Sequence, residues 1–351
     1  MTINTPSLAA VAVEFPPYRY SQEESAQALG DFAGPEFRRF FDASGVSSRH
    51  LALPLSRYGE LSGFTEANDT FIEVALDLGE QALLTALDAA KVKPDEVDVV
   101  VSTTVTGLAV PTLEARLAAR VGLRPDVKRV PLFGLGCVAG AAGVARIHDY
   151  LRAYPDQVAA LVAVELCSLT IQRDDRSMAN FVAASLFGDG AAAVIATGAG
   201  RRPAEPRMPK ILATRSRLYP DTEDVMGWDI GSSGFRIKLS VEVATVVYKY
   251  LADDVHNFLA DCGLSADDVS TYICHPGGPK VIDAVQNVLD LPVNALDRTR
   301  TSLRENGNLS SVSVLDVLRA TLADPPPPPG SFGLMVAMGP GFCSELVLLG
   351  W

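Results

Sequence analysis

Apolar runs of strand length alternate with amphipathic stretches along the first half of the chain. Nearly unbroken apolar or β-branched runs are typical of buried strands, and they occur at 7–13, 97–104, 130–133, 158–164 and 191–197. Apolar residues at helical spacing indicate helices at 21–30, 35–42, 71–92 and 112–121, and a further helix that leaves Cys137 toward Tyr150. Strands and helices in alternation predict an α/β fold with a parallel sheet.

The second half of the chain repeats this order of elements. A helix expected at 241–261 leads through a short acidic turn into a strand that ends at Cys274, just as the helix at 71–92 leads into the strand at 97–104. We therefore predict two similar halves, residues 1–200 and 201–351, packed together in layers. The remaining expected elements are helices at 279–289 and 311–323, an extended proline run at 325–329 and strands at 331–338 and 343–349.

Composition and charge narrow the class of protein. The 351 residues are 48% hydrophobic and 21% charged, which describes a globular chain with a substantial core. A net charge of −12 without a block of Lys or Arg argues against nucleic acid as a partner. No secretory signal pattern is visible, and no apolar run is long enough to cross a membrane. We therefore expect a cytoplasmic protein without stable membrane insertion.

The cysteines and histidines lack the spacing of a disulfide framework or a metal site. The five cysteines form no CxxC pair and the four histidines form no HExxH motif, so we expect reduced thiols and no metal. Gly134, Gly136 and Gly140 miss the spacing of a dinucleotide-binding loop, so no nicotinamide or flavin cofactor is expected.

Cys137 is the first candidate for chemistry, because it lies in a glycine-rich turn between a predicted strand and a predicted helix. A thiol at a helix N-terminus faces unpaired N–H groups and the positive end of the helix dipole, and both favour the thiolate. The glycines of the turn let the backbone approach the sulfur closely. The alternative is that Cys137 is a small buried hydrophobic residue, as free cysteines usually are.

His275 and Asn308 are the other two candidates for chemistry. Cys137 and His275 each follow a predicted strand, one in each half, and sites in α/β proteins form at the carboxyl ends of strands. A histidine beside a cysteine can hold a nucleophilic thiolate, and an asparagine amide can donate to an oxyanion. Taken singly, His275 fits a hydrogen-bonded core histidine better than a catalytic one, and Asn308 fits a helix N-cap better than an oxyanion donor.

Together these three segments resemble the Cys-His-Asn triad of type III polyketide synthases, the chalcone-synthase-like branch of the thiolase-fold condensing enzymes. The resemblance spans essentially the whole chain and includes His275-Pro-Gly-Gly-Pro279, Gly307-Asn-Leu-Ser-Ser311, Leu186-Phe-Gly-Asp-Gly190 and Met338-Gly-Pro-Gly-Phe342. It implies a thiolase-like α/β fold in which two duplicated βαβαβ-type halves form an αβαβα sandwich. It also implies an acyltransferase in which Cys137 carries the acyl chain. His275 and Asn308 would polarise the thioester of malonyl-CoA and stabilise the enolate left by loss of CO2.

The resemblance further implies which residues shape the substrate cavity. Phe187 matches one of two gatekeeper phenylalanines, and the second falls on Phe235, with Ile237 on the same strand face. Trp228 stands near a position that is small in plant members and shapes their starter pocket. The other expected cavity residues are Cys167, Thr170, Ser310, Met338, Gly339 and Pro340.

CoA thioesters and a second copy of the chain are the partners that the resemblance implies. Arg39 has a counterpart among the basic residues by which plant members hold CoA phosphates, and Arg38 and Arg49 are further candidates. The alternative for Arg38 and Arg39 is a solvated helix face. Val110 and Pro111 correspond to the turn that reaches into the partner's cavity, so a homodimer is expected.

The segments 165–170, 224–229 and 341–345 look most like bacterial alkylresorcinol and alkylpyrone synthases. This likeness predicts a medium- or long-chain fatty acyl-CoA starter and alkylresorcinol, resorcylic acid or alkylpyrone products. One alternative is a type III synthase primed by acetyl- or malonyl-CoA. The others are a ketoacyl synthase III-like enzyme that condenses once and a catalytically silent partner protein.

Overall fold

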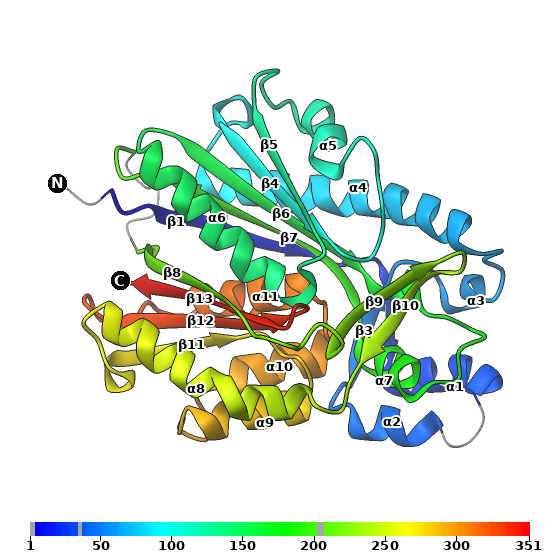
Figure 1. The fold of residues 1–351 in the computed structure, drawn as a ribbon. Coiled ribbons are helices and arrows are strands. Elements are labelled where there is room, and N and C mark those ends of the chain that lie inside the picture. The colour runs from blue at the N-terminus through cyan, green and yellow to red at the C-terminus, as the bar shows by residue number, and fades with distance from the viewer. Residues whose placement is uncertain (1–3, 34–36, 202–206) are drawn as a thin grey trace.

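The strands of both halves join into one nine-stranded sheet in the computed structural model, which describes residues 4–33, 37–201 and 207–351 (Figure 1). The strand order is β11-β12-β13-β8-β1-β7-β6-β4-β5. The first half supplies β1 (Ser7–Glu14), β4 (Val99–Thr104), β5 (Lys128–Phe133), β6 (Val158–Leu166) and β7 (Asp189–Thr197). The second half supplies β8 (Lys210–Leu218), β11 (Val269–Cys274), β12 (Phe332–Gly339) and β13 (Cys343–Gly350). The halves meet where Ser7 of β1 pairs with Lys210 of β8.

The expected parallel sheet is wrong, because the sheet is mixed. Among the described strands, β4 is parallel to β5 and β6, and β11 is parallel to β12. In contrast, β7 runs antiparallel to β1 and β6, and β13 runs antiparallel to β12 and β8. The turn between β12 and β13 is too short for the crossover that parallel strands need, so this pair is antiparallel.

Helices cover both parts of the sheet and fill the space between them. The outer helices are α4 (Phe64–Ala90) and α5 (Leu113–Val121) on the first part, and α8 (Val243–Asp261), α9 (Pro279–Val288) and α10 (Asp297–Asn306) on the second. The central helices α6 (Ala139–Ala153) and α11 (Ser311–Ala323) contact strands of both parts. The predicted α-β-α-β-α layering is therefore confirmed (Figure 1).

The two central helices approach each other through a glycine. A Cβ at Gly140 of α6 would lie 2.2 Å from the carbonyl oxygen of Ser311, the first residue of α11. No side chain other than hydrogen fits there without moving backbone, so Gly140 sets the distance between the two helices. Because α6 and α11 each begin near a candidate catalytic residue, this contact also positions the site.

Smaller elements lie at one end of the sheet, where α1, α2, α3 and α7 gather beside two short sheets (Figure 1). The helices are α1 (Gln22–Ala33), α2 (Arg38–Ala43), α3 (Leu55–Tyr58) and α7 (Met178–Leu186). The strands are β2 (Tyr18–Ser21) paired with β3 (Ser48–Leu51), and β9 (Met226–Gly231) paired with β10 (Gly234–Leu239). Part of the helix expected at 35–42 lies outside the described residues.

Within the described ranges, no helix is both long enough and apolar enough to pass through a bilayer. In the same part of the chain, no three His, Cys, Asp or Glu side chains gather as metal ligands would. The division of the chain at residue 200 stays a prediction.

Candidate active site

Cys137 lies in a tight turn that the loop after β12 covers. The turn forms a 3-10 helix, η3 (Gly136–Val138), between β5 and α6, and the cysteine is 5% exposed. Gly136 has a φ of +56°, and a Cβ on it would lie 2.8 Å from the ring of Pro340. A Cβ on Gly339 would lie 2.7 Å from the backbone nitrogen of Val138. Glycine is therefore required on both sides of this contact, as the glycine-rich sequence indicates.

The surroundings of the thiol do not favour its ionised form, contrary to the expectation from a helix terminus. Burial raises the pKa of Cys137 to about 12, although a hydrogen bond with Ser310 lowers it and opposes that shift. Removal from water destabilises the thiolate by more than the few N–H groups of the turn stabilise it. In the unliganded site Cys137 is therefore a neutral thiol that needs a base to become a nucleophile.

His275 follows β11 directly and is a buried imidazole without a partner. Its backbone N–H donates to Val336 of the neighbouring strand at 2.9 Å, which places it at the carboxyl ends of β11 and β12. Within the described chain neither ring nitrogen has a hydrogen-bond partner. Burial lowers the pKa of His275 to about 3, so the ring is neutral. The described chain thus offers the ring no partner that would make it a satisfied core histidine, and a catalytic role would account for the unpaired nitrogens.

Asn308 lies between α10 and α11 and reaches the loop that follows His275. Its Nδ2 donates to the carbonyl of Gly277 at 3.4 Å, and its Oδ1 accepts the backbone N–H of Ser310 at 2.9 Å. The second bond fixes the amide ahead of α11 much as a cap would, yet it leaves one Nδ2 hydrogen for a substrate. Ser310 has a φ of +51°, a strained value for a residue with a side chain.

Glu165, at the end of β6, is a site residue that the sequence did not reveal. It is fully buried and accepts hydrogen bonds from the backbone N–H of Val105 at 3.1 Å and the hydroxyls of Thr106 at 3.0 Å and Ser311 at 2.5 Å. Burial raises the pKa of Glu165 to about 7, and its charge also acts on Cys137. The available signal was an acidic residue within an otherwise apolar strand, one position before its end.

The hairpin of β9 and β10 presents the expected cavity residues on one face. Ile237 pairs with Trp228 across the two strands, and Phe235 lies two residues before Ile237, so all three side chains share a face. The rings of Trp228 and Phe235 are 5.9 Å apart. Cys167 and Thr170 lie on the 3-10 helix η4 (Cys167–Thr170), which follows β6 and contacts β10.

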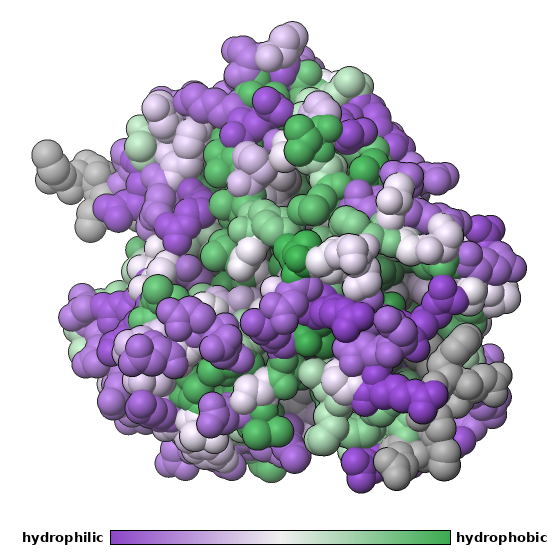
Figure 2. All heavy atoms as spheres, turned by 45° about the vertical axis from the view of Figure 1, so that its right-hand side comes forward, coloured by the Kyte–Doolittle hydropathy of each residue, from purple (hydrophilic) through white to green (hydrophobic). Residues whose placement is uncertain are grey.

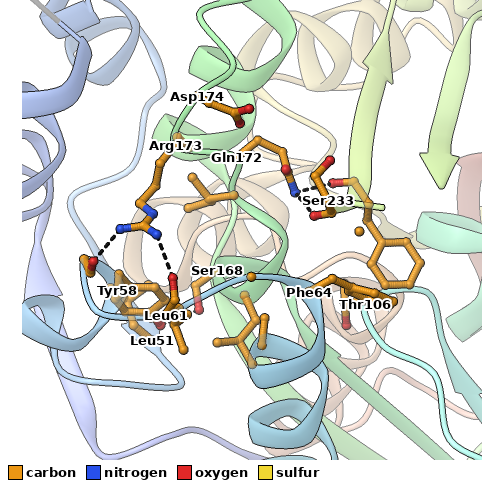
Figure 3. Close-up of a pocket in the computed structure, with 18 of the residues that line it drawn as sticks. Leu51, Tyr58, Leu61, Phe64, Thr106, Ser168, Gln172, Arg173, Asp174 and Ser233 are labelled. Carbon is orange, nitrogen blue, oxygen red and sulfur yellow. Dashed lines mark hydrogen bonds between the residues drawn. The ribbon is translucent and has the colours of Figure 1, made fainter. Parts of the chain in front are cut away.

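A cavity of about 580 Å³ opens beside these elements (Figure 3). Its walls are the segment that leads into α4, the residues that follow η4, and the tip of the β9–β10 hairpin. Cys137, His275 and Asn308 do not line it. Thr106 does, and its hydroxyl donates to Glu165, whose charge in turn acts on Cys137.

The other expected cavity residues lie at different depths. Phe187 is half-buried, and its backbone forms an isolated bridge with Asn308. Met338 is buried at the end of β12. Val110 is 93% exposed on the loop before α5, away from its own chain's core.

The three expected CoA-binding arginines have different surroundings. Arg49 is 1% exposed, and its guanidinium donates to the carbonyls of Ala184 and Phe187 and to the side chain of Gln22. This burial argues against the expected contact with a CoA phosphate. Arg38 pairs with Glu23, as a solvated helix face would allow, whereas Arg39 is exposed and stacks on Phe40.

Comparison with known proteins identifies the class and then the family. A five-layered α/β fold with a buried cysteine, histidine and asparagine at one end of its strands defines a thiolase-like acyltransferase. The models of the N-terminal and C-terminal domains of chalcone and stilbene synthases match residues 36–200 and 210–350. The chain belongs to this family of type III polyketide synthases, which are acyltransferases that condense malonyl-CoA iteratively.

Two of the similar proteins are named for the aromatic compounds that they make. The chain is 52% identical to the 1,3,6,8-tetrahydroxynaphthalene synthase of Streptomyces peucetius subsp. caesius, over 98% of this chain and 93% of that protein. It is 30% identical to the phloroglucinol synthase of Pseudomonas fluorescens, over 97% of each. The crystal structure of the tetrahydroxynaphthalene synthase of Streptomyces coelicolor A3(2) superimposes with a TM-score of 0.93 at 30% identity, covering 98% of this chain and 99% of that one.

These relatives correct the expected branch of the family. They give no support to a special likeness to alkylresorcinol and alkylpyrone synthases, or to a long-chain starter. The matched models, which are those of chalcone and stilbene synthases, also argue against the alternative of a single-condensation ketoacyl synthase.

Proposed function

We propose that this enzyme makes a tetrahydroxynaphthalene-type aromatic polyketide from malonyl-CoA alone, with malonyl-CoA also serving as the starter. The observation that carries the proposal is the 52% identity, over nearly the whole chain, to a 1,3,6,8-tetrahydroxynaphthalene synthase. The side chains of the hairpin agree with it. Phe235 lines the cavity and the ring of Trp228 packs against it, and such an aromatic wall suits a short starter better than a long alkyl chain.

The carbon count of such a product fits a chain of malonyl units. A naphthalene ring has ten carbons, which equals five two-carbon units. Five malonyl-CoA molecules lose five CO2 and five CoA, and one aldol ring closure loses one water, which leaves four oxygens on the ring. One thioester bond to the enzyme breaks when the second ring closes by attack of a carbanion on the acyl carbon.

The roles proposed for the triad follow from its chemistry. Cys137 is a neutral thiol and His275 a neutral imidazole with free nitrogens, so His275 can accept the thiol proton as Cys137 attacks the starter thioester. His275 and Asn308 then donate to the thioester oxygen of the incoming malonyl-CoA. This stabilises the enolate that forms when CO2 leaves, and the enolate attacks the acyl group on Cys137.

The test is incubation of the purified protein with malonyl-CoA labelled with 13C at every malonyl carbon, followed by mass spectrometry. We expect a product of formula C10H8O4 in which all ten carbons are labelled, with or without unlabelled acetyl-CoA or stearoyl-CoA in the mixture. Cys137→Ala should give no product. A product that forms only when a second acyl-CoA is added, and that carries its unlabelled carbons, would refute the malonyl starter.

A homodimer and a CoA contact complete the proposal. Figure 2 shows hydrophobic residues gathered in the middle of one face of the molecule, with hydrophilic residues around them. Exposed apolar side chains occur on the edge strand β5, at Val130 and Phe133, and on the loop that carries Val110. An uncovered apolar edge strand is prone to aggregate, and a partner chain that covers it removes this risk.

Arg39, which has no ion-pair partner among the described residues, is the arginine proposed to meet a CoA phosphate.

A further inference from the structure

Gln172 connects two walls of the cavity beside the candidate active site through its side-chain amide. It lies just beyond η4, the segment that carries Cys167 and Thr170. Its Nε2 is 3.2 Å from the carbonyl oxygen of Thr170 and 3.1 Å from the carbonyl oxygens of both Ser233 and Phe235. One side chain therefore bonds to η4 and to the tip of the β9–β10 hairpin. Figure 3 shows it pointing toward Ser233.

The position of Gln172 is itself fixed from α7. The backbone carbonyl of Gln172 accepts a hydrogen bond from Asn180 Nδ2 at 2.7 Å, and its N–H donates to Asn180 Oδ1 at 3.3 Å. Asn180 is buried, and Ser177 caps the helix turn on which it sits. Gln172 is thus held at both ends, by α7 through its backbone and by the hairpin through its amide.

Besides Gln172, two features hold the hairpin on this side of the cavity: a solvent-exposed ion pair of Arg236 on β10 with Asp174, at 3.2 Å, and packing of the tip on α4. A Cβ on Gly234, whose φ is +93°, would lie 2.7 Å from the ring of Phe64, so the tip rests on the first turn of α4. The ring of Phe235 packs edge-on against Phe64 at 5.6 Å. The apolar contacts and the exposed ion pair restrain the tip only weakly, because a solvated ion pair contributes little, whereas the hydrogen bonds from Gln172 fix the distance of the tip from η4.

We propose that Gln172 is a positioning residue that sets starter specificity, by fixing the aromatic face of the hairpin against the wall that carries Cys167 and Thr170. It touches no reacting atom and acts through Trp228 and Phe235. The inference rests on the proposed function in so far as these aromatic residues bound the starter site. Loss of its donors allows the hairpin to move away from η4, and the widened site accepts larger acyl groups.

Two substitutions separate this role from a purely structural one. Gln172→Glu keeps the size but, when ionised, places a negative charge opposite three carbonyl oxygens; when protonated, it can donate once. Gln172→Met keeps a similar length with no donor at any pH. Gln286→Glu is the matched control, because Gln286 on α9 also donates to a backbone carbonyl, that of Pro292, far from the cavity.

The measurement is the ratio of products primed by hexanoyl-CoA to products primed by malonyl-CoA, at pH 6 and pH 8. For Gln172→Glu we expect this ratio to rise at least about tenfold over wild type at pH 8, the selectivity that one misfitted contact is worth, and to return toward wild type at pH 6. Gln172→Met should raise the ratio at both pH values. Gln286→Glu should leave it unchanged.

Ratios equal to wild type in both Gln172 variants would overturn the proposal, provided that circular dichroism and thermal unfolding show both to be folded. If Gln172→Glu does not fold, Gln172→Met decides alone. A wild-type enzyme that is not primed by malonyl-CoA would refute the proposed function instead. In that case the shift in ratio between wild type and the variants, for whichever starters it accepts, still tests Gln172.

Discussion

His275 is a base only if it lies within reach of the Cys137 thiol, and the reactivity of that thiol reports the contact. Both groups are neutral in the free site, since burial raises the pKa of Cys137 to about 12 and lowers that of His275 to about 3. Without the imidazole the thiol proton has no nearby acceptor. We expect His275→Ala to slow alkylation of Cys137 by iodoacetamide at pH 8 by roughly tenfold or more. Peptide mass spectrometry at successive times measures the rate at which Cys137 is alkylated.

The half-buried Cys262 provides the internal control for that experiment, because it lies at the end of α8, remote from the site. Its alkylation rate should be the same in wild type and variant. An unchanged rate at Cys137, with the variant folded, would show that His275 does not act on the thiol.

Glu165 links the pH dependence of stability to the site. Burial raises the pKa of Glu165 from its ordinary 4.5 to about 7, so the folded protein binds this proton more tightly than the unfolded chain does. The contribution of Glu165 to the free energy of unfolding is therefore fully present below about pH 4.5. It is lost as the pH rises through 7, a change on the order of 3 kcal/mol. Glu165→Gln removes this titration and should flatten the fall in unfolding free energy between pH 5 and pH 8, measured by urea denaturation. An identical fall in both proteins would refute the assignment.

At the scale of elements, the contact between α6 and α11 can be tested through Gly140. Its Cβ position lies 2.2 Å from the backbone oxygen of Ser311, so Gly140→Ala must push the two helices apart. We expect a loss of about 1–3 kcal/mol or more in unfolding free energy and a large loss of product formation, because Ser310 and Asn308 shift with α11. Gly231→Ala is the control, since nothing lies within 4 Å of its Cβ position. Equal stability of the two variants would contradict the tight contact.

The apolar pattern predicted the elements that are buried and missed those that are not. β6 and β7 are buried along their whole length, and their continuous apolar sequences indicated strands. The apolar pattern did not predict α10, because Leu303 is the one large apolar residue in this helix and its other residues are mostly polar. α4 begins at Phe64 rather than Phe71, because its first two turns are mostly polar and only partly buried, so they lack an apolar periodicity. β5 has an apolar sequence, yet it is an exposed edge strand, which a single chain's pattern cannot distinguish from a buried one.

The sequence predicted those residues of the candidate site that belong to short motifs. The sequence placed Cys137 and His275 after strands and Asn308 ahead of a helix, because these positions depend on local sequence. The burial of Arg49 and the bonds of Glu165 and Gln172 depend on partners more than fifty residues away, which local patterns do not contain. The direction of the Cys137 pKa shift was also missed, since the sequence shows the helix terminus but not the depth of burial.

At the scale of the whole molecule, the exposed edge of the sheet predicts a dimer. Val130 on β5 is 38% exposed, and Val110, on the neighbouring loop, is expected to reach the partner's cavity. We expect the wild-type protein to sediment at about twice its chain mass of 37.3 kDa. Val130→Asp places a charge on the covered edge, where its desolvation would cost several kcal/mol, so it should sediment as a monomer.

The same substitution should abolish product formation, because each cavity would lose the turn that the other chain is expected to supply. Val293→Asp is the matched control, since Val293 is 83% exposed on a loop of the second half and carries the same change without touching β5. It should remain dimeric and active. A wild-type monomer at micromolar concentration would refute the dimer, and so would a Val130→Asp dimer with full activity. A Val130→Asp monomer that still makes product would leave the dimer standing but show that one chain holds a complete cavity.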